Sequence, residues 1–186
     1  MFVAVLLPPA ASEDLAEFLA PRQEAGPELR WTGPEQWHVT LAFLPDVADR
    51  HLDDLSVRLG RAAARRTPWQ VSLASGGAFP HPAHAKVLFA AVDADDPEEL
   101  RRAATGARAA ATKSGTLVEG GRFHPHVTLA RMRRPLEATR WIRVLEAYRG
   151  PTWTAEELAL VASHLGEGPR RRPRYEVLET FRIGRQ

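Results

Sequence analysis

The pentapeptide HVTLA occurs twice in the chain, at residues 38–42 and again at residues 126–130. Valine and threonine have branched β-carbons and favour strands, so both copies are expected to be strands. Because side chains alternate between the two faces of a strand, each histidine and the threonine two positions later should share a face. Each copy should therefore present an imidazole beside a hydroxyl, while its valine and leucine point into a core.

The similarity between the two regions extends beyond the pentapeptide when the chain is aligned with itself at an offset of 88 residues (126 − 38). Upstream of each copy lies an apolar run, then a proline-containing turn and a helical pattern, with Ser12 and Asp96 as candidate N-caps. Downstream, each copy is followed by a helical pattern and a strand-like segment that begins with tryptophan, WQVSLASGGAF and WTAEELALVASHL. Each half, about residues 1–85 and 86–186, therefore predicts the order strand, helix, strand, helix, strand.

The two halves are joined without a glycine- and serine-rich linker, and a length of 186 residues is typical of one domain. We therefore expect a single α+β domain over residues 1–186, composed of two lobes related by a pseudo-twofold axis. Each lobe should contain an antiparallel sheet with helices, and the active site should lie in the central cleft. Since this internal duplication removes one reason to dimerise, a monomer is expected.

The composition excludes several classes of site. The chain has no cysteine, so disulfides, thiolate nucleophiles and cysteine-based metal sites are excluded, in agreement with a reducing cytosol. The opening MFVAVLL lacks a basic region and resembles a buried strand more than a signal peptide. No apolar run approaches the roughly 18 residues that a membrane span requires. We therefore expect a cytoplasmic protein with no membrane partner.

Arginine dominates the basic residues. Of the 25 lysines and arginines, only Lys86 and Lys113 are lysines. Arginine suits planar, bidentate contacts with phosphate, but arginine clusters can equally be solvated surface. One cluster lies in the Gly- and Pro-containing segment GEGPRRRPRY, which should form a turn. The arginines of this turn either hold RNA phosphates at the rim of the cleft or face solvent: Arg170, Arg171, Arg172 and Arg174.

The duplicated histidines and threonines predict acid–base chemistry on a phosphodiester. Polar side chains are costly to bury in a core, so a cleft shared by the two copies explains their presence better. With an ordinary pKa of about 6.5, one imidazole can accept a proton while the other donates one. Threonine hydroxyls can hydrogen-bond phosphoryl oxygens. Water could then attack phosphorus in line, without a covalent nucleophile.

Several neighbouring residues are weaker candidates. Arg131 follows the second motif and could contact a phosphate, although strict alternation places it off the His/Thr face. Phe43, Phe79 and Tyr175 could stack on a base or could simply pack in the core. The pair His124 and His126 suggests a metal, but two imidazoles need further ligands and the first copy has no matching histidine. No metal site is therefore expected.

The motifs HVTLAF and FHPHVTLAR, together with FVAVLLP, GGAFP, ALVASHL and YEVLETFRI, give the chain a resemblance to the 2H phosphoesterases over nearly its full length. Within them it is most similar to the RNA 2′,3′-cyclic phosphodiesterases, once described as 2′–5′ RNA ligases. The resemblance implies hydrolysis of a terminal 2′,3′-cyclic phosphate to a 2′-phosphomonoester, without metal or other cofactor, on RNA ends or cyclic nucleotides. It implies that His38 is the proton donor, His126 the general base, and Thr40 and Thr128 the phosphate-binding residues.

Two other functions remain open from the sequence. One is a non-catalytic RNA- or nucleotide-binding module, although arginine or asparagine would serve binding as well as the two histidines. The other is a related phosphoesterase acting on ADP-ribose cyclic phosphate or another small cyclic nucleotide. The resemblance is imperfect at Pro45, where relatives often have glycine, but this turn lies beyond the motif.

Overall fold

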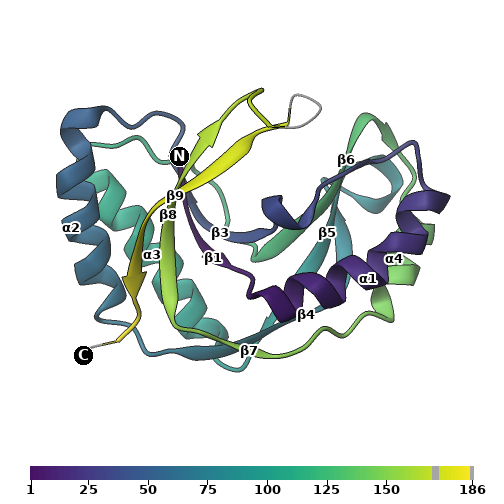
Figure 1. The fold of residues 1–186 in the computed structure, drawn as a ribbon, viewed down its shortest axis with the longest axis horizontal. Coiled ribbons are helices and arrows are strands. Elements are labelled where there is room, and N and C mark those ends of the chain that lie inside the picture. The colour runs from purple at the N-terminus through teal and green to yellow at the C-terminus, as the bar shows by residue number, and fades with distance from the viewer. Residues whose placement is uncertain (169–171, 185–186) are drawn as a thin grey trace.

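Two antiparallel sheets organise the fold in the computed structural model, which describes residues 1–168 and 172–184 (Figure 1). The four-stranded sheet has the order β3-β1-β8-β9, formed by His38–Phe43, Phe2–Leu6, Glu157–His164 and Arg174–Arg182. The five-stranded sheet has the order β2-β6-β5-β4-β7, formed by Arg30–Trp31, His126–Leu136, Ala85–Ala94, Trp69–Phe79 and Trp153–Ala155. Both HVTLA segments are strands, as predicted, and the α+β bilobal fold is confirmed.

The helices of the described residues divide between the two sheets (Figure 1). Helices α2 (Leu52–Ala63) and α3 (Pro97–Lys113) pack against each other and against strands of the four-stranded sheet. Helix α4 (Thr139–Glu146) packs on β4 and β5, and α1 (Pro9–Ala25) lies beside it. Short 3₁₀ turns complete the connections at η1 (Pro34–Gln36), η2 (Asp49–His51) and η3 (Pro82–His84).

Of the two predicted helix N-caps, Asp96 is confirmed and Ser12 is wrong. Helix α3 begins as predicted, because the Asp96 carboxylate accepts a hydrogen bond of 2.9 Å from the backbone N–H of Glu99. Ser12 does not cap α1, which begins at Pro9 and includes the hydrogen bond from Ser12 N to Pro8 O (3.0 Å). A proline at the first helical position lacks only an N–H that the helix would leave unpaired, so the helix starts earlier than the serine suggests.

The two halves of the sequence exchange elements between the lobes. Strand β4 comes from the first half but pairs with β5, and β8 comes from the second half but pairs with β1. Aligning β3-β1-β8-β9 with β6-β5-β4-β7 places the two HVTLA strands in equivalent positions. The helices are exchanged in the same way. Helix α1 follows β1 of the four-stranded sheet but lies with the five-stranded sheet, and α3 follows β5 of the five-stranded sheet but packs against β3 of the four-stranded sheet. Each lobe therefore depends on residues from both halves.

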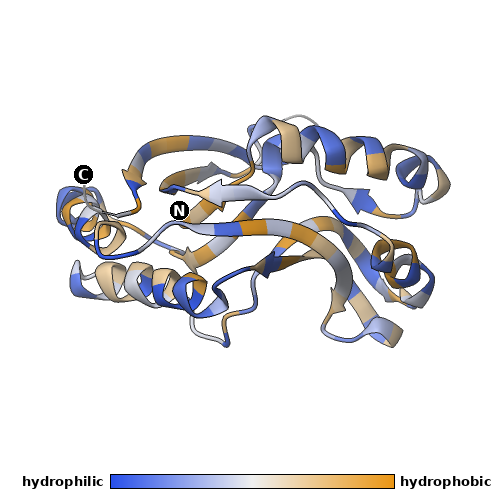
Figure 2. Cartoon of the chain, turned by 90° about the horizontal axis from the view of Figure 1, so that it is seen from below, coloured by the Kyte–Doolittle hydropathy of each residue, from blue (hydrophilic) through white to orange (hydrophobic). Residues whose placement is uncertain are grey.

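Hydrophobic and hydrophilic residues intermix along the strands and helices, which gives the elements a face for the core (Figure 2). In the HVTLA strands the predicted core positions Val39, Leu41, Val127 and Leu129 are at most 1% exposed. Strands β3 and β6 also contact each other, so the core is continuous at the junction of the lobes. In the part of the chain that the structure describes, no helix has both the length and the apolar character that crossing a bilayer requires.

Candidate active site

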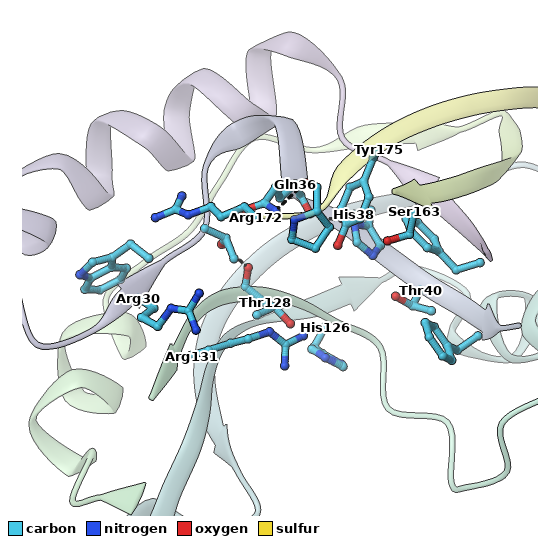
Figure 3. A pocket seen from close by; sticks show the side chains of 15 residues that line it. Arg30, Gln36, His38, Thr40, His126, Thr128, Arg131, Ser163, Arg172 and Tyr175 are labelled. Carbon is cyan, nitrogen blue, oxygen red and sulfur yellow. Dashed lines mark hydrogen bonds between the residues drawn. The ribbon is translucent and has the colours of Figure 1, made fainter. Parts of the chain in front are cut away.

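A pocket of about 390 Å³ lies where the two HVTLA strands meet. His38 and Thr40 line it from β3, and His126 and Thr128 line it from β6 (Figure 3). The register of the sheets produces this arrangement, since the valine between each histidine and threonine is buried on the opposite face. The structure thus brings all four residues of the duplicated motifs together around one space.

A β-bulge in each motif strand changes which residues follow the histidine and threonine into the pocket. Leu41 in β3 and Leu129 in β6 have no opposite partner on the neighbouring strand. Each leucine and the alanine after it are therefore both buried, and the next residues, Phe43 and Arg131, turn back to the His/Thr face. The prediction that alternation keeps Arg131 off that face is wrong, because a bulge shifts the alternation by one residue.

The aromatic candidates also separate. Phe43 is 42% exposed and lines the pocket, so simple core packing does not describe it. Tyr175 lines the same pocket, and its ring lies edge-on to that of His38 at a centroid distance of 5.4 Å. Phe79 does not line this pocket; it stacks on Phe89 with ring centroids 4.4 Å apart and so belongs to the packing behind the site.

The two catalytic candidates are oriented by the same backbone contact. His38 Nδ1 lies 2.8 Å from the carbonyl oxygen of Gln36, and His126 Nδ1 lies 2.7 Å from that of His124. A carbonyl oxygen can only accept a hydrogen bond, so Nδ1 carries the proton in both rings. Each Nε2 is then the nitrogen that can accept or donate a catalytic proton.

Both imidazoles favour the neutral form in the ligand-free protein. Burial lowers the pKa of His38 from its ordinary value of 6.5 to about 4, although its bond to the Gln36 carbonyl acts in the opposite direction; the charges of His126 and Arg131 lower it further. Burial also lowers the pKa of His126, again opposed by a carbonyl, with added repulsion from His124 and Arg131. Arg131 lines the same pocket as both rings, and its positive charge disfavours protonation of each.

Aromatic side chains hold the two histidines differently. Phe2 stacks on His38 at a centroid distance of 4.3 Å, and the Phe2 ring in turn contacts Tyr175 edge-on at 5.0 Å. His126 instead meets the edges of Phe79 and Phe89 at 5.0 and 5.3 Å. These apolar surroundings are the physical cause of the burial that disfavours the charged imidazoles.

The sequence interpretation missed several residues of the pocket, among them Phe2, Arg30, Thr32, Gln36 and Ser163. For Gln36 the only signal was its position two residues before His38, which matches the position of His124 before His126; it lies in the 3₁₀ turn η1 and not in the strand. Arg30 and Thr32 gave no such signal. They belong to or follow β2, which has no counterpart in the internal repeat.

The arginine-rich segment is divided by the structure. Arg172 lines the pocket, whereas Arg174 pairs with Glu167 at 2.8 Å and Glu176 at 3.4 Å. Arg170 and Arg171 lie outside the described residues. Of the predicted rim, one member therefore faces the pocket and another is held by carboxylates.

In the described part of the chain, the HPH sequence does not belong to a larger set of metal ligands. The rings of His124 and His126 have centroids 6.2 Å apart. Within residues 1–168 and 172–184, no cluster of three or more His, Cys, Asp or Glu side chains could hold a metal ion.

Comparison with known proteins places this chain in a family. The model of the 2′-5′ RNA ligase superfamily matches residues 7–167. The RNA 2′,3′-cyclic phosphodiesterase of Thermus thermophilus is 31% identical over 191 aligned positions, which cover 98% of this chain and 89% of that protein.

Solved structures share the fold of this protein along nearly its whole length. Apo E. coli LigT has a TM-score of 0.77 at 26% identity and covers 99% of this chain and 96% of its own; its complex with 3′-AMP has the same score and identity, with 98% and 96% covered. A Thermus thermophilus structure has a TM-score of 0.76 at 29% identity, with 100% and 98% covered. The resemblance drawn from the duplicated motifs is confirmed, and the chain belongs to the 2′-5′ RNA ligase superfamily.

Proposed function

We propose that this protein is an RNA 2′,3′-cyclic phosphodiesterase, a hydrolase that opens a terminal 2′,3′-cyclic phosphate to a 2′-phosphomonoester. One observation carries the proposal: two equivalent strands direct a histidine and a threonine each into one pocket, with both imidazoles anchored through Nδ1. The Thermus thermophilus relative has this activity as its name, which supports the same reaction here.

In the proposed reaction the two histidines and two threonines of the motifs, here called the quartet, hold the phosphate from both sides. The Thr40 and Thr128 hydroxyls donate hydrogen bonds to the non-bridging phosphate oxygens, and Arg131 adds a positive charge beside them. A water molecule attacks phosphorus and passes a proton to His126 Nε2, while His38 Nε2 donates a proton to O3′ as the P–O3′ bond breaks. The products are a 2′-phosphomonoester and a free 3′-hydroxyl, and the two histidines have exchanged protonation states.

The assignment of His38 as donor places a demand on the substrate. In the ligand-free protein His38 is the histidine with the pKa of about 4, so it is uncharged at neutral pH. A donor must carry its proton before the reaction. A phosphate anion bound between the rings favours their charged forms and raises both pKa values. The proposed order therefore requires that the bound phosphate raise the pKa of His38 enough for this ring to be protonated.

Metal-independence is part of the proposal, because two imidazoles and two hydroxyls supply the acid, the base and the phosphate contacts. The ligands we propose are RNA ends or cyclic nucleotides, and the existence of a complex of E. coli LigT with 3′-AMP supports nucleotide binding by this chain. We further propose that the protein acts as a monomer in the cytoplasm, with residues 1–186 as one domain.

Phosphorus NMR of the protein with 2′,3′-cyclic AMP tests the proposed function. We expect the cyclic-phosphate signal to be replaced by that of 2′-AMP. Formation of 3′-AMP would contradict the proposed leaving group, and binding without turnover would favour a non-catalytic module. Turnover of ADP-ribose cyclic phosphate alone, in a parallel sample, would assign the protein to that substrate instead.

A further inference from the structure

The pocket breaks the pseudo-twofold symmetry of its catalytic quartet. Strand β2 extends the five-stranded sheet beyond β6 and places Arg30 opposite Arg131 in the antiparallel register. Among the described residues, no strand occupies the equivalent position beyond β3. Arg172, just before β9, lines the same pocket. Arg30 and Arg172, which come from segments outside the repeat, thus join Arg131, which follows the second HVTLA motif.

These arginines gather on one side of the pocket. In Figure 3, Arg30 and Arg131 lie toward Thr128, and Arg172 extends in the same direction, away from Thr40 and Ser163. On the opposite side, the Phe2 ring stacks on His38 and the Tyr175 ring lies edge-on to it. The pocket therefore has a cationic side and an aromatic side, although its central residues are duplicated.

The described residues supply no carboxylate to balance the charges on the cationic side. No aspartate or glutamate from residues 1–168 or 172–184 lines the pocket, and within those ranges Arg30, Arg131 and Arg172 form no ion pair. Guanidinium groups that converge without carboxylates repel one another, so an anion bound among them is favourable. Arg174 shows the contrast, since two glutamates already neutralise it.

A terminal cyclic phosphate accounts for only part of this charge. It carries a single negative charge and lies between the two His/Thr pairs under the proposed function, with Arg131 beside it. Arg30 and Arg172 remain available for a second anion. In an RNA end, the next anion along the chain is the phosphodiester on the 5′ side of the terminal nucleotide.

We propose that Arg30 and Arg172 form a second phosphate subsite, which binds the phosphodiester 5′ to the terminal nucleotide. This inference rests on the proposed function. It identifies the preferred substrate of the site as an RNA end rather than a free nucleoside cyclic phosphate. It also gives the ligand a direction, because the upstream strand must leave the pocket over the Thr128 side. A pocket with only the duplicated quartet could not distinguish the two orientations.

Product analogues test the subsite without turnover. Calorimetry should show that adenosine 2′,5′-bisphosphate binds about 10- to 100-fold more tightly than 2′-AMP, the range expected for one added pair of charge-assisted contacts. Arg30→Gln and Arg172→Gln should each remove most of this ratio. The matched control is Arg133→Gln, an exposed β6 arginine outside the pocket lining, which should keep the ratio. Thermal melts of all three variants should coincide with the wild type.

Equal affinities of the two analogues for the wild type would overturn the subsite. It would also be overturned if either variant weakened both ligands by the same factor, because the arginine would then act at the catalytic phosphate. Hydrolysis assays separate the failure of the subsite from the failure of the proposed function. If the binding ratio is preserved but neither 2′,3′-cyclic AMP nor its 5′-phosphorylated form is hydrolysed, only the proposed reaction is refuted. A 5′-phosphate that improves kcat/KM, with no gain from a 5′-linked nucleotide, would overturn the RNA assignment.

Discussion

Replacement of Thr32 by valine should disturb both motifs at once, because the Thr32 hydroxyl connects them. Trp37 Nε1, next to His38 in sequence, donates a 3.0 Å hydrogen bond to Thr32 Oγ1. The same hydroxyl lies 2.7 Å from the carbonyl oxygen of Thr128 and 2.9 Å from that of Leu129, across the bulge in β6. A chain of hydrogen bonds thus runs from the start of β3 to the threonine that lines the pocket from β6.

The expected cost follows from the groups that lose partners. Each hydrogen bond contributes about 1 kcal/mol net, and a buried donor left unpaired costs about 1–3 kcal/mol. Trp37 is only 4% exposed, so its indole N–H is such a donor. Thr32→Val should therefore destabilise the fold by about 2–4 kcal/mol. At about 2–4 °C per kcal/mol for a chain of this length, Tm should fall by about 4–16 °C.

Thr32→Val should also slow the reaction below its melting temperature. Loss of one complete hydrogen-bond donor to a transition state costs about 10²–10³-fold in kcat. Thr128 remains present in the variant and only its backbone support changes, so a decrease of about 10-fold in kcat is expected, with a smaller change in KM.

Thr32→Ser is the matched control for this variant, because it retains the hydroxyl and should restore kcat and most of Tm. Thermal unfolding and steady-state hydrolysis of 2′,3′-cyclic AMP, measured well below both melting temperatures, supply the two readouts. A Thr32→Val protein with lowered Tm and unchanged kcat would refute the link to catalysis. An unchanged Tm would refute the hydrogen-bond chain itself.

Three further outcomes follow from the site. His38→Ala and His126→Ala should each lower kcat by about 10²–10⁴-fold, the usual range for acid–base catalysis, and near-normal turnover of either would remove that histidine from the mechanism. Activity should be complete in excess EDTA; loss that a divalent ion reverses would contradict the metal-free reaction. Protonation of His38 is disfavoured in the folded state. The neutral His38 ring therefore makes its full contribution to the free energy of unfolding above about pH 6.5, and this contribution is lost as pH falls toward 4. That loss is about 3 kcal/mol from the lowered pKa, and chemical denaturation of His38→Ala should show a correspondingly flatter pH dependence.

The sequence predicts which four residues meet in the candidate site, because duplication records the same geometry twice. Two histidines with threonines at the same spacing, in strands of equal context, left few arrangements other than a shared cleft. The exchange of β4 and β8 between sheets was beyond this reasoning, since alignment of a chain with itself identifies repeated elements and not their pairing partners. Hydrogen bonding between strands distant in sequence decides that pairing.

The errors of detail have local causes. Alternation misplaced Arg131, because a bulge adds one residue to one strand and no residue type in HVTLA announces it. Ser12 was a plausible N-cap, but Pro9 has a fixed φ that suits the first helical position, so the helix begins three residues before the serine. Both cases show that residue preference describes a position in isolation, while neighbouring strands and residues decide among the conformations that it permits.

Repeated and non-repeated segments supply different parts of the proposed function. Duplication yields two equivalent imidazoles, but in-line displacement needs one to accept a proton while the other donates, and the repeat alone gives no reason for either to take one role. The difference must come from residues that the sequence repeat lacks: Tyr175 beside His38, and Arg30 and Arg172 on the side of Thr128. An upstream phosphate bound by those arginines, as proposed above, would fix which ester oxygen faces which histidine. The direction of the RNA chain, set outside the repeat, would then decide which imidazole acts as the acid.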